Sequence, residues 1–446
     1  MIIFKNEQYL PCSIPEISYT YERKAISDKE APLYLREDLF VYPMNAGFIV
    51  ENNNGQFLTD SIDLLQLICG KSVNDLCHNE KDFEEIEQYY RYGLIGYEKN
   101  AAAKLVIPEV SQKYFHLYEN SQTTWFCHIP LKIELDITKK CNLQCKHCSR
   151  EASPLTTEGE MSLQNYVDVI QQAGKIGIPE FSFMGGEPTC NPSLIELATI
   201  ARMSGIRTLS TSTNGWLINE ELAKKIAILF DSVQVSIHGA DSETHDAIVG
   251  RPGAFSRACK AIELLKKHNV SSLNISCTVM NENVHQMDAM IQLAKDLQVE
   301  SIRFLVLFSK GRGSQLNQWK KEEKTDMANN LKILSDKNTN SLKVESGGFP
   351  PYYTIGNNAA IYGCPAGRSL MYISADGDVR ACGNLDHTIG NIRDTKIMDL
   401  WHSDTVIALR KKPTCDCPYT DICAGGCLAN EYWSKMFNIN TTPIML

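Results

Sequence analysis

The middle of the chain alternates short apolar runs with longer stretches in which apolar residues recur every three to four positions. Short runs rich in β-branched residues predict strands, and the longer period predicts amphipathic helices. The strands are expected at 131–137, 181–184, 208–213, 233–237, 273–279 and 302–308, and the helices near 162–175, 192–203, 219–230, 254–268 and 283–297. Six such units in series predict an α/β fold whose parallel sheet curls into a full or partial (β/α)6 barrel, with chemistry at the C-terminal ends of the strands.

Before residue 100 the order changes to strands first and helices afterwards. Turn residues at 45–47 and 52–55 separate predicted strands, and Asp60 is expected to cap a helix that ends at Gly70. The strands are expected within 33–43 and 47–59, and two further helices at 73–77 and 82–92. This order resembles a small winged-helix fold, and residues 98–130 are expected to include a linker.

Charge argues against nucleic acid as the partner of this N-terminal segment. Residues 36–97 contain four Lys or Arg and eleven Asp or Glu, and the whole chain carries a net charge of −9. An acidic surface repels phosphate. We therefore expect no nucleic-acid partner. A module that takes an extended peptide on its sheet edge fits better, and a purely structural packing domain is the alternative.

The chain has 43% hydrophobic residues but no uninterrupted apolar run of membrane-spanning length. Its first residues lack the basic end, apolar core and small-residue cleavage site of a signal peptide. We therefore expect a cytoplasmic protein without a membrane partner.

Cysteine is the unusual residue, with 16 copies unevenly placed. Clustered thiols in a cytosolic chain indicate metal or iron–sulfur ligands. The grouped cysteines are Cys141, Cys145 and Cys148, then Cys364 and Cys382, then Cys415, Cys417, Cys423 and Cys427. The others are expected to be buried core thiols, namely Cys12, Cys69, Cys77, Cys127, Cys190, Cys259 and Cys277.

The triplet of Cys141, Cys145 and Cys148 directly follows the first predicted barrel strand. Three thiolates on one loop can bind three irons of a four-iron, four-sulfur (4Fe–4S) cluster and leave the fourth iron open, whereas a closed structural cluster would use four cysteines. Zinc is the alternative, but it usually takes four ligands and this spacing is not a common zinc pattern.

The segment Cys141–Cys148, with the sequence CNLQCKHC, strongly resembles the cysteine loop of the radical S-adenosylmethionine (SAM) superfamily. The resemblance implies a partial (β/α)6 TIM-like barrel. It also implies a 4Fe–4S cluster whose open iron chelates the amino and carboxylate groups of SAM. One electron then cleaves SAM to a 5′-deoxyadenosyl radical, which abstracts a substrate hydrogen. His147 stands where the family packs a residue near the adenine.

Residues at the ends of later strands extend this resemblance. Gly185, Gly186 and Glu187 look like the family's GGE motif, in which the glycines allow close backbone approach and the glutamate accepts from the SAM ammonium. The other residues that the resemblance assigns to SAM binding are Thr213, Asn214, Ser236, His238 and Arg303. The segment 311–313 resembles an adenine-side backbone contact. The sequence assigns no catalytic base.

The C-terminal cysteines resemble the SPASM extension, the auxiliary-cluster domain of many radical SAM peptide and protein maturases. By analogy, one cluster would use Cys364, Cys382 and Cys427, and a second would use Cys415, Cys417 and Cys423. The chain departs from the pattern because 415–417 is one residue short of CxxC and no cysteine follows Cys427. We therefore expect one or two auxiliary iron–sulfur clusters, with a zinc ribbon as the alternative.

The N-terminal segment looks like the pyrroloquinoline-quinone chaperone-like (PqqD-like) domain that binds the leader of a precursor peptide. Four segments follow: a leader-recognition domain at 1–110, a linker at 111–130, a radical SAM barrel at 131–340 and a SPASM-like domain at 341–446.

The resemblance predicts a maturase that forms a thioether, carbon–carbon or ether cross-link in a ribosomally made peptide, with a flavodoxin- or ferredoxin-type electron donor. Oxidation of a protein side chain, as in sulfatase maturases, or of a small alcohol is one alternative. A redox-inactive peptide-binding protein with structural clusters is the other.

Overall fold

The computed structural model describes residues 28–411 and 427–429, apart from internal gaps. The gaps are 45–46, 53–54, 60–61, 69–70, 92–93, 101–102, 112, 115–116, 119–122, 124–125, 156–157, 339–340 and 350–363. The predictions for Cys12, Asp60, Cys69, Gly70, Cys415, Cys417 and Cys423 therefore lie outside the described residues. The chain divides into two compact units, 1–129 and 130–446, and each is described by itself.

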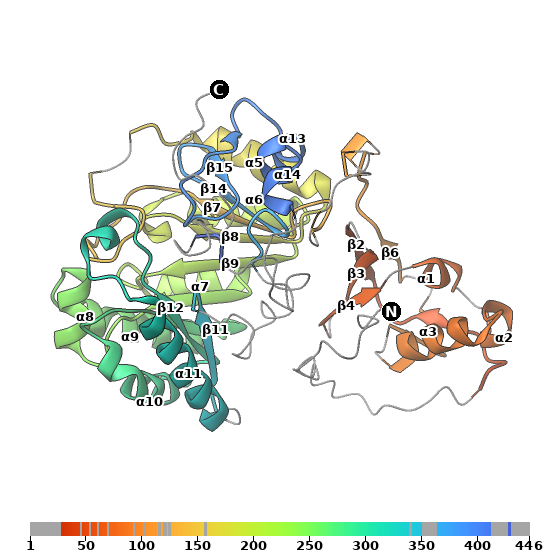
Figure 1. The fold of residues 1–446 in the computed structure, drawn as a ribbon, viewed down its shortest axis with the longest axis horizontal. Helices are drawn as coiled ribbons and strands as arrows, with labels where there is room; N and C mark the ends of the chain where they lie inside the picture. The colour runs from red at the N-terminus through yellow and green to blue at the C-terminus, as the bar shows by residue number, and fades with distance from the viewer. Residues whose placement is uncertain are drawn as a thin grey trace. The chain divides into compact units, whose positions relative to one another are not determined.

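The N-terminal unit has a four-stranded sheet in the order β4-β3-β2-β6 (Figure 1). Its strands are β2 (Leu39–Met44), β3 (Gly47–Asn52), β4 (Gly55–Thr59) and β6 (Leu105–Val106), and β1 (Tyr34–Leu35) pairs with β5 (Ile95–Gly96). Its helices are α1 (Asp63–Leu67), α2 (Val73–Leu76) and α3 (Glu80–Arg91). Buried residues such as Val41, Val50 and Ile86 form its core. The strands-first order is as predicted, but β6 lies in the stretch expected as a linker, and Ile62 takes the N-cap position of α1.

The C-terminal unit is built on a ten-stranded sheet in the order β13-β12-β11-β10-β9-β8-β7-β14-β15-β16. Its seven consecutive parallel strands are β7 (Lys132–Asp136), β8 (Glu180–Met184), β9 (Thr208–Thr213), β10 (Ser232–Ser236), β11 (Ser272–Val279), β12 (Ser301–Val306) and β13 (Lys343–Gly347). The predicted α/β fold with a large parallel sheet is confirmed. The strand β13 is an addition, because the local pattern stopped at six strands.

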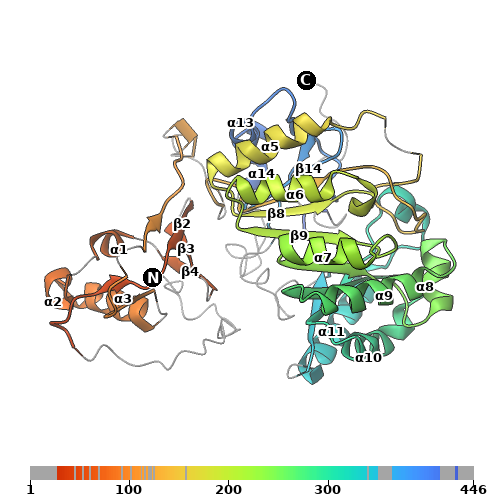
Figure 2. The same cartoon turned by 180° about the vertical axis from the view of Figure 1, so that it is seen from behind.

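Helices cover the outer face of this sheet (Figure 2). They are α5 (Leu163–Ile176), α6 (Leu194–Met203), α7 (Glu220–Leu229), α8 (Ser242–Val249), α9 (Ala254–Lys267), α10 (Met287–Asp296) and α11 (Lys321–Asn338), with short 3-10 helices η2 (Pro188–Cys190), η3 (Val284–Gln286) and η4 (Gly311–Gln315). Alternate strand residues such as Phe181, Val233 and Phe304 pack in the core with these helices. The intervening positions are polar, and this alternation gives the sheet a polar inner face.

The strand β14 (Leu370–Ile373) pairs in parallel with β7, and β15 (Asp378–Arg380) and β16 (Gly390–Asn391) continue the sheet. Two short helices, α13 (Ile397–Trp401) and α14 (Asp404–Arg410), follow. The cysteine-rich region is thus joined to the barrel by backbone hydrogen bonds.

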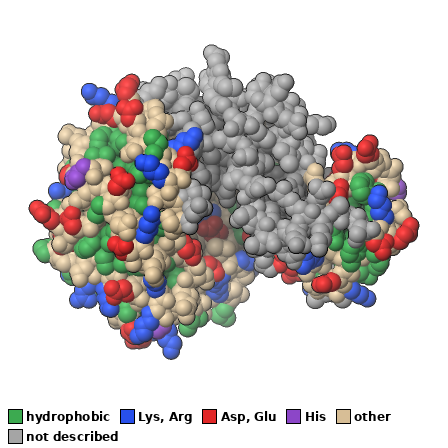
Figure 3. All heavy atoms as spheres, turned by 90° about the horizontal axis from the view of Figure 1, so that it is seen from below, with side chains coloured by type: hydrophobic (Ala, Val, Ile, Leu, Met, Phe, Trp, Pro, Cys, Tyr) green, Lys and Arg blue, Asp and Glu red, His purple; other side chains and the backbone are tan. Residues whose placement is uncertain are grey.

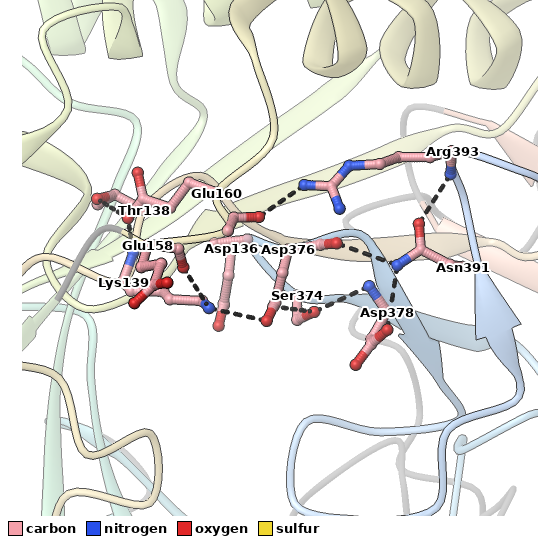
Figure 4. Close-up of polar contacts among 12 residues, drawn as sticks. Asp136, Thr138, Lys139, Glu158, Glu160, Ser374, Asp376, Asp378, Asn391 and Arg393 are labelled. Atoms are coloured by element: carbon pink, nitrogen blue, oxygen red, sulfur yellow. Dashed lines mark hydrogen bonds and ion pairs between the residues drawn. The ribbon is translucent and has the colours of Figure 1, made fainter.

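Side chains reinforce this junction (Figure 4). Lys139, just past β7, forms a 2.8 Å ion pair with Asp376 in the turn after β14, and Arg393 donates to the Gly159 carbonyl at 2.6 Å. On the face of the molecule in Figure 3, Lys and Arg side chains are interspersed with Asp and Glu. None of the described helices is both long and apolar enough to cross a membrane.

Candidate active site

A cavity of about 440 Å³ opens at the C-terminal ends of the barrel strands. All nine residues that the sequence assigned to cofactor binding line it, namely His147, Gly185, Gly186, Glu187, Thr213, Asn214, Ser236, His238 and Arg303. The cysteines that line it are Cys141, Cys145, Cys148 and Cys382. The fold therefore brings residues from seven strands, β7 to β13, and the cysteine loop to one place, as expected for a barrel.

The cysteine loop is held by backbone contacts on two sides. On one side, the amides of Gln144 and Lys146 donate to the carbonyls at the end of α8, at 3.2 and 3.0 Å. On the other, Arg312 in η4 donates to the Cys145 carbonyl at 2.8 Å and to the Ala152 carbonyl at 3.1 Å. These contacts fix the loop conformation before any ligand binds.

The thiols of Cys141 and Cys145 are protonated in the absence of metal. Burial raises the pKa of Cys141 to about 12, and burial followed by the neighbouring Cys148 raises that of Cys145 further. Among the described residues, no group of three His, Cys, Asp or Glu side chains is set to hold a single metal ion. A cubic cluster spreads its thiolates over different irons, so three spaced cysteines suit a cluster better than one ion.

The two glycines allow close packing of the second strand's loop against the first. A Cβ at Gly185 would lie 2.3 Å from the Thr138 carbonyl, and one at Gly186 would lie 2.4 Å from the Lys140 carbonyl. The Gly186 amide donates to Thr138 and the Glu187 amide donates to Lys140, both at 2.8 Å. Any side chain at either position would separate the two loops.

The carboxylate of Glu187 is buried, and both of its oxygens accept hydrogen bonds. Oε1 accepts from the hydroxyls of Thr189 and Thr213, both at 2.6 Å, and Oε2 accepts from the Asn214 amide at 2.7 Å. Burial raises the pKa of Glu187, against these hydrogen bonds. The Asn214 side chain in turn donates to Asn142 at 2.7 Å and thereby joins β9 to the cysteine loop.

Buried histidines stand beside the cysteine loop. The rings of His147 and His238 lie 4.2 Å apart between centroids, and burial lowers the pKa of His147 to about 4 and that of His238 well below its usual range. Both are therefore neutral at pH 7. Nδ1 of His238 accepts from the Thr278 amide at 3.2 Å, whereas the buried Nδ1 of His147 has no partner among the described residues.

Arg303 extends from β12 into the same cavity. Its Nε is buried, and no described residue accepts a hydrogen bond from it. Gly347 on β13 leaves it room, because a Cβ there would lie 3.4 Å from Nε. Three thiols, the close-packed glycines, and an imidazole nitrogen and a guanidinium Nε that have no partner among the described residues fit a 4Fe–4S cluster and SAM.

A second group of cysteines lies at the edge of this cavity. Cys364 and Cys427 share a hydrogen bond, which lowers the pKa of Cys364 and raises that of Cys427. Burial raises the pKa of Cys382 to about 12, and its charge interactions include both Glu134 and Cys364. The three cysteines predicted to share one auxiliary cluster are thus neighbours.

Lys310 holds the loop after Cys382. Its Nζ donates to the Gly383 carbonyl at 2.8 Å and forms a 2.9 Å ion pair with Asp386. Of the cysteines predicted to be core thiols, Cys127 and Cys277 are buried, while Cys77, Cys190 and Cys259 are only partly buried.

The sequence reasoning missed several cavity residues. These are Glu134, Arg150, Gln234 and Ser276. The signal that could have found Glu134, Gln234 and Ser276 is the alternation of polar and apolar residues within each strand, which puts the polar ones on the inner face. Arg150 could not be found in this way, because its 2.6 Å bond to Asp136 depends on the loop conformation.

Comparisons with known proteins agree with this geometry. The model of the radical SAM superfamily matches residues 135–294, and that of an iron–sulfur cluster-binding domain, SPASM, matches residues 364–428. An AdoMet-dependent heme synthase of Oleidesulfovibrio alaskensis is 30% identical, over 70% of this chain and 86% of its own. The mycofactocin maturase MftC of Mycolicibacterium smegmatis is 31% identical, over 69% of this chain and 80% of its own.

Among solved structures, SuiB of Streptococcus suis bound to SAM has the same fold, with a TM-score of 0.68 and 16% identity. The match covers 89% of this chain and 96% of SuiB, and SuiB has also been crystallised with its precursor peptide SuiA. These matches imply 4Fe–4S clusters and SAM as cofactors, as the sequence predicted. The chain therefore belongs to the radical SAM superfamily, as an enzyme with a C-terminal SPASM iron–sulfur domain.

Proposed function

We propose that this enzyme is a maturase that cross-links a ribosomally made precursor peptide. The observation that carries the proposal is the extent of the fold shared with SuiB. A match to 89% of the chain is more than the unit 130–446 alone can supply, so the likeness reaches into the N-terminal unit. SuiB has been crystallised with a precursor peptide, and MftC is named a maturase, in contrast to the heme synthases.

The N-terminal unit would bind the leader of the precursor. The strand β4 stands at one end of its four-stranded sheet, where its outer backbone groups are free of sheet partners among the described residues. An edge strand of this kind can accept an extended peptide as an added strand, with main-chain hydrogen bonds supplying affinity. This supports a leader-recognition role for residues 1–110, joined by 111–130 to the barrel at 131–340 and the SPASM-like domain at 341–446.

The barrel cavity would hold the core of the peptide beside the cluster. When bound, SAM on the reduced cluster supplies a deoxyadenosyl radical that takes a hydrogen atom from carbon. Glu187, Asn214 and the loop at 185–187 would hold SAM, and the polar inner face would orient the peptide. Fixing both reactants in one cavity makes the step effectively intramolecular. A flavodoxin or ferredoxin in the cytoplasm would deliver the electron.

The test uses the short peptide encoded beside this gene, incubated with anaerobically reconstituted enzyme, SAM and reductant. We expect a loss of two hydrogens in the core of the peptide, measured by exact mass against a control without SAM. Deletion of residues 1–110 should greatly slow the reaction on the full precursor. An unchanged peptide mass while deoxyadenosine still forms would contradict the proposal.

An oxidation of a porphyrin side chain is the second candidate, because the heme synthase relative aligns over most of its own length. Adding iron coproporphyrin in place of the peptide tests it directly. A change in the mass of the porphyrin, with none in the peptide, would favour this function.

A further inference from the structure

The strand β7 directs three charged residues toward the inner face of the barrel. Lys132 forms a 2.6 Å ion pair with Glu180, and Asp136 accepts from Arg150 at 2.6 Å and from the Tyr372 hydroxyl at 2.5 Å. Glu134 lies between them on the same face and lines the cavity. In the part of the chain that the structure describes, its carboxylate has no hydrogen bond or ion pair. Asp136 makes both contacts through Oδ2, and of the three residues Glu134 is the one that lines the cavity.

Two carboxylates line the cavity among the described residues, Glu134 and Glu187. Glu187 already accepts from Thr189, Thr213 and Asn214, and it lies in the loop that would hold SAM. The neutral His238 cannot accept a proton at Nδ1 without losing the Thr278 amide bond. Glu134 is therefore the acidic side chain of this cavity that is free to act on a substrate.

A cross-linking reaction needs such a group. The peptide loses two hydrogens in forming one new bond, and they leave in different ways. One leaves carbon as a hydrogen atom, which SAM accepts through its deoxyadenosyl carbon. The other leaves a sulfur, oxygen or carbon of the peptide as a proton, while one electron passes from the peptide to an oxidised iron–sulfur cluster. The proton needs an acceptor within hydrogen-bond reach.

We propose that Glu134 is the catalytic residue that takes this proton from the peptide as the cross-link closes. This role rests on the proposed function. The carboxylate belongs to the strand that leads into the cysteine triplet, and it lines the same cavity as Arg303. It also lies near enough to Cys382 for its charge to act on that thiol. A proton acceptor at this position lies in the same cavity as the cysteine triplet and Cys382.

The positions of the neighbouring charges support an exchange of protons with the peptide. Arg150, which interacts electrostatically with Glu134, is held by Asp136 and is not free to neutralise it. The inner face of the barrel also carries hydroxyl and amide groups from β9 and β10, such as Ser212 and Gln234, which hydrogen-bond each other at 3.2 Å. Such groups can hydrogen-bond to a carboxylate without neutralising its charge.

The experiment compares the wild-type holoenzyme with Glu134→Gln, Glu134→Asp and Glu134→Ala, using the neighbouring precursor peptide as the probe. We expect Glu134→Gln to keep its iron content and its rate of deoxyadenosine formation, but to lose cross-linked product by about 100-fold or more. Glu134→Asp should retain part of the activity, and formate should restore product in Glu134→Ala. Glu180→Gln is the control, because Glu180 lies on the next strand and pairs with Lys132 outside the cavity.

The outcomes separate the two proposals. Product formation by Glu134→Gln at the wild-type rate would overturn the role of Glu134 and leave the cross-linking function intact. Equal loss of product and of deoxyadenosine would show a structural role and would also overturn it. A peptide left unmodified by the wild-type enzyme would overturn the proposed function and, with it, this role.

Discussion

Arg312 donates from Nε to the carbonyl of Cys145 at 2.8 Å and so fixes the backbone between two thiols of the triplet. Its Nη1 reaches the Ala152 carbonyl as well, at 3.1 Å, which a lysine ammonium cannot match with the same planar fork. We expect Arg312→Lys to lower cluster affinity or SAM cleavage about 10- to 100-fold, as for other groups that orient metal ligands. Iron content and the rate of deoxyadenosine formation measure this.

The matched control is Arg202→Lys, because Arg202 also binds a backbone carbonyl, that of Leu229 at 3.0 Å, but on the helical side of the barrel. This variant should unfold more easily and still cleave SAM normally when folded. Equal SAM cleavage by Arg312→Lys and the wild type would refute the positioning role.

Alanine substitutions should separate the two iron–sulfur sites. Cys141→Ala removes a ligand of the loop at 141–148, so we expect the loss of about one cluster and of SAM cleavage. Cys382→Ala should lower the iron content while SAM cleavage continues, because Cys382 groups with Cys364 and Cys427. Iron analysis and electron paramagnetic resonance measure both. Cys259→Ala, on α9, should change neither.

Gly186→Ala should disable SAM binding more than it lowers stability. Its Cβ would lie 2.4 Å from the Lys140 carbonyl oxygen, so this carbonyl would have to move. The movement would disturb the hydrogen bond that the carbonyl accepts from the Glu187 amide. We expect no detectable SAM cleavage. Gly205→Ala is the comparison, because Gly205 has φ +89° but open space around it. That variant should lose about 1–2 kcal/mol of stability and keep its activity. Similar activity in the two variants would contradict the packing argument.

The N-cap of α8 should make a pH-dependent contribution to the stability of this helix, whose last carbonyls accept hydrogen bonds from the cysteine loop. Asp241 accepts from the Thr244 amide at 2.8 Å, and this bond, together with others, lowers the pKa of Asp241 below 3.8. A lowered pKa stabilises the folded state above about pH 3.8, and the contribution is lost as the pH falls through the folded-state value. Asp241→Ala should therefore cost about 1 kcal/mol at neutral pH and little in acid.

Hydrogen exchange of the α8 amides at about pH 7 and at a series of lower pH values measures this, with a roughly fivefold effect expected at about pH 7 that shrinks as the pH falls below about 3.8. Glu243→Ala on the same helix is the control, since the Glu243 side chain is exposed. An effect of Asp241→Ala that does not change with pH would argue against the carboxylate as its source.

Much of this fold could be predicted from local pattern. The six barrel strands and the helices between them, and the position of Gly185, Gly186 and Glu187 after the second strand, follow from periodicity and from the rule that chemistry lies at strand ends. The cysteine loop was found because its ligands are close in sequence. In each case the information lies within a few residues of the feature.

Long-range pairing could not be predicted. The sequence of 343–347 does not indicate which strand it pairs with. The β-sheet register that sets Tyr372 opposite Glu134 joins residues that are far apart in the sequence. The free carboxylate of Glu134 could not be predicted for the same reason. Lys132 pairs with Glu180, and Asp136 binds Arg150 and Tyr372, so Glu134 is left without a partner among the described residues.

The addition of β14 beside β7 has a mechanical consequence. The first barrel strand, which leads into the cysteine triplet, and the strand that leads toward Cys382 share one hydrogen-bonded ladder. The separation between the two groups of thiols is then set by sheet register and does not change with whatever peptide is bound. Electron tunnelling depends steeply on distance, so a register of this kind would act as a fixed spacer between clusters bound at the two groups of thiols.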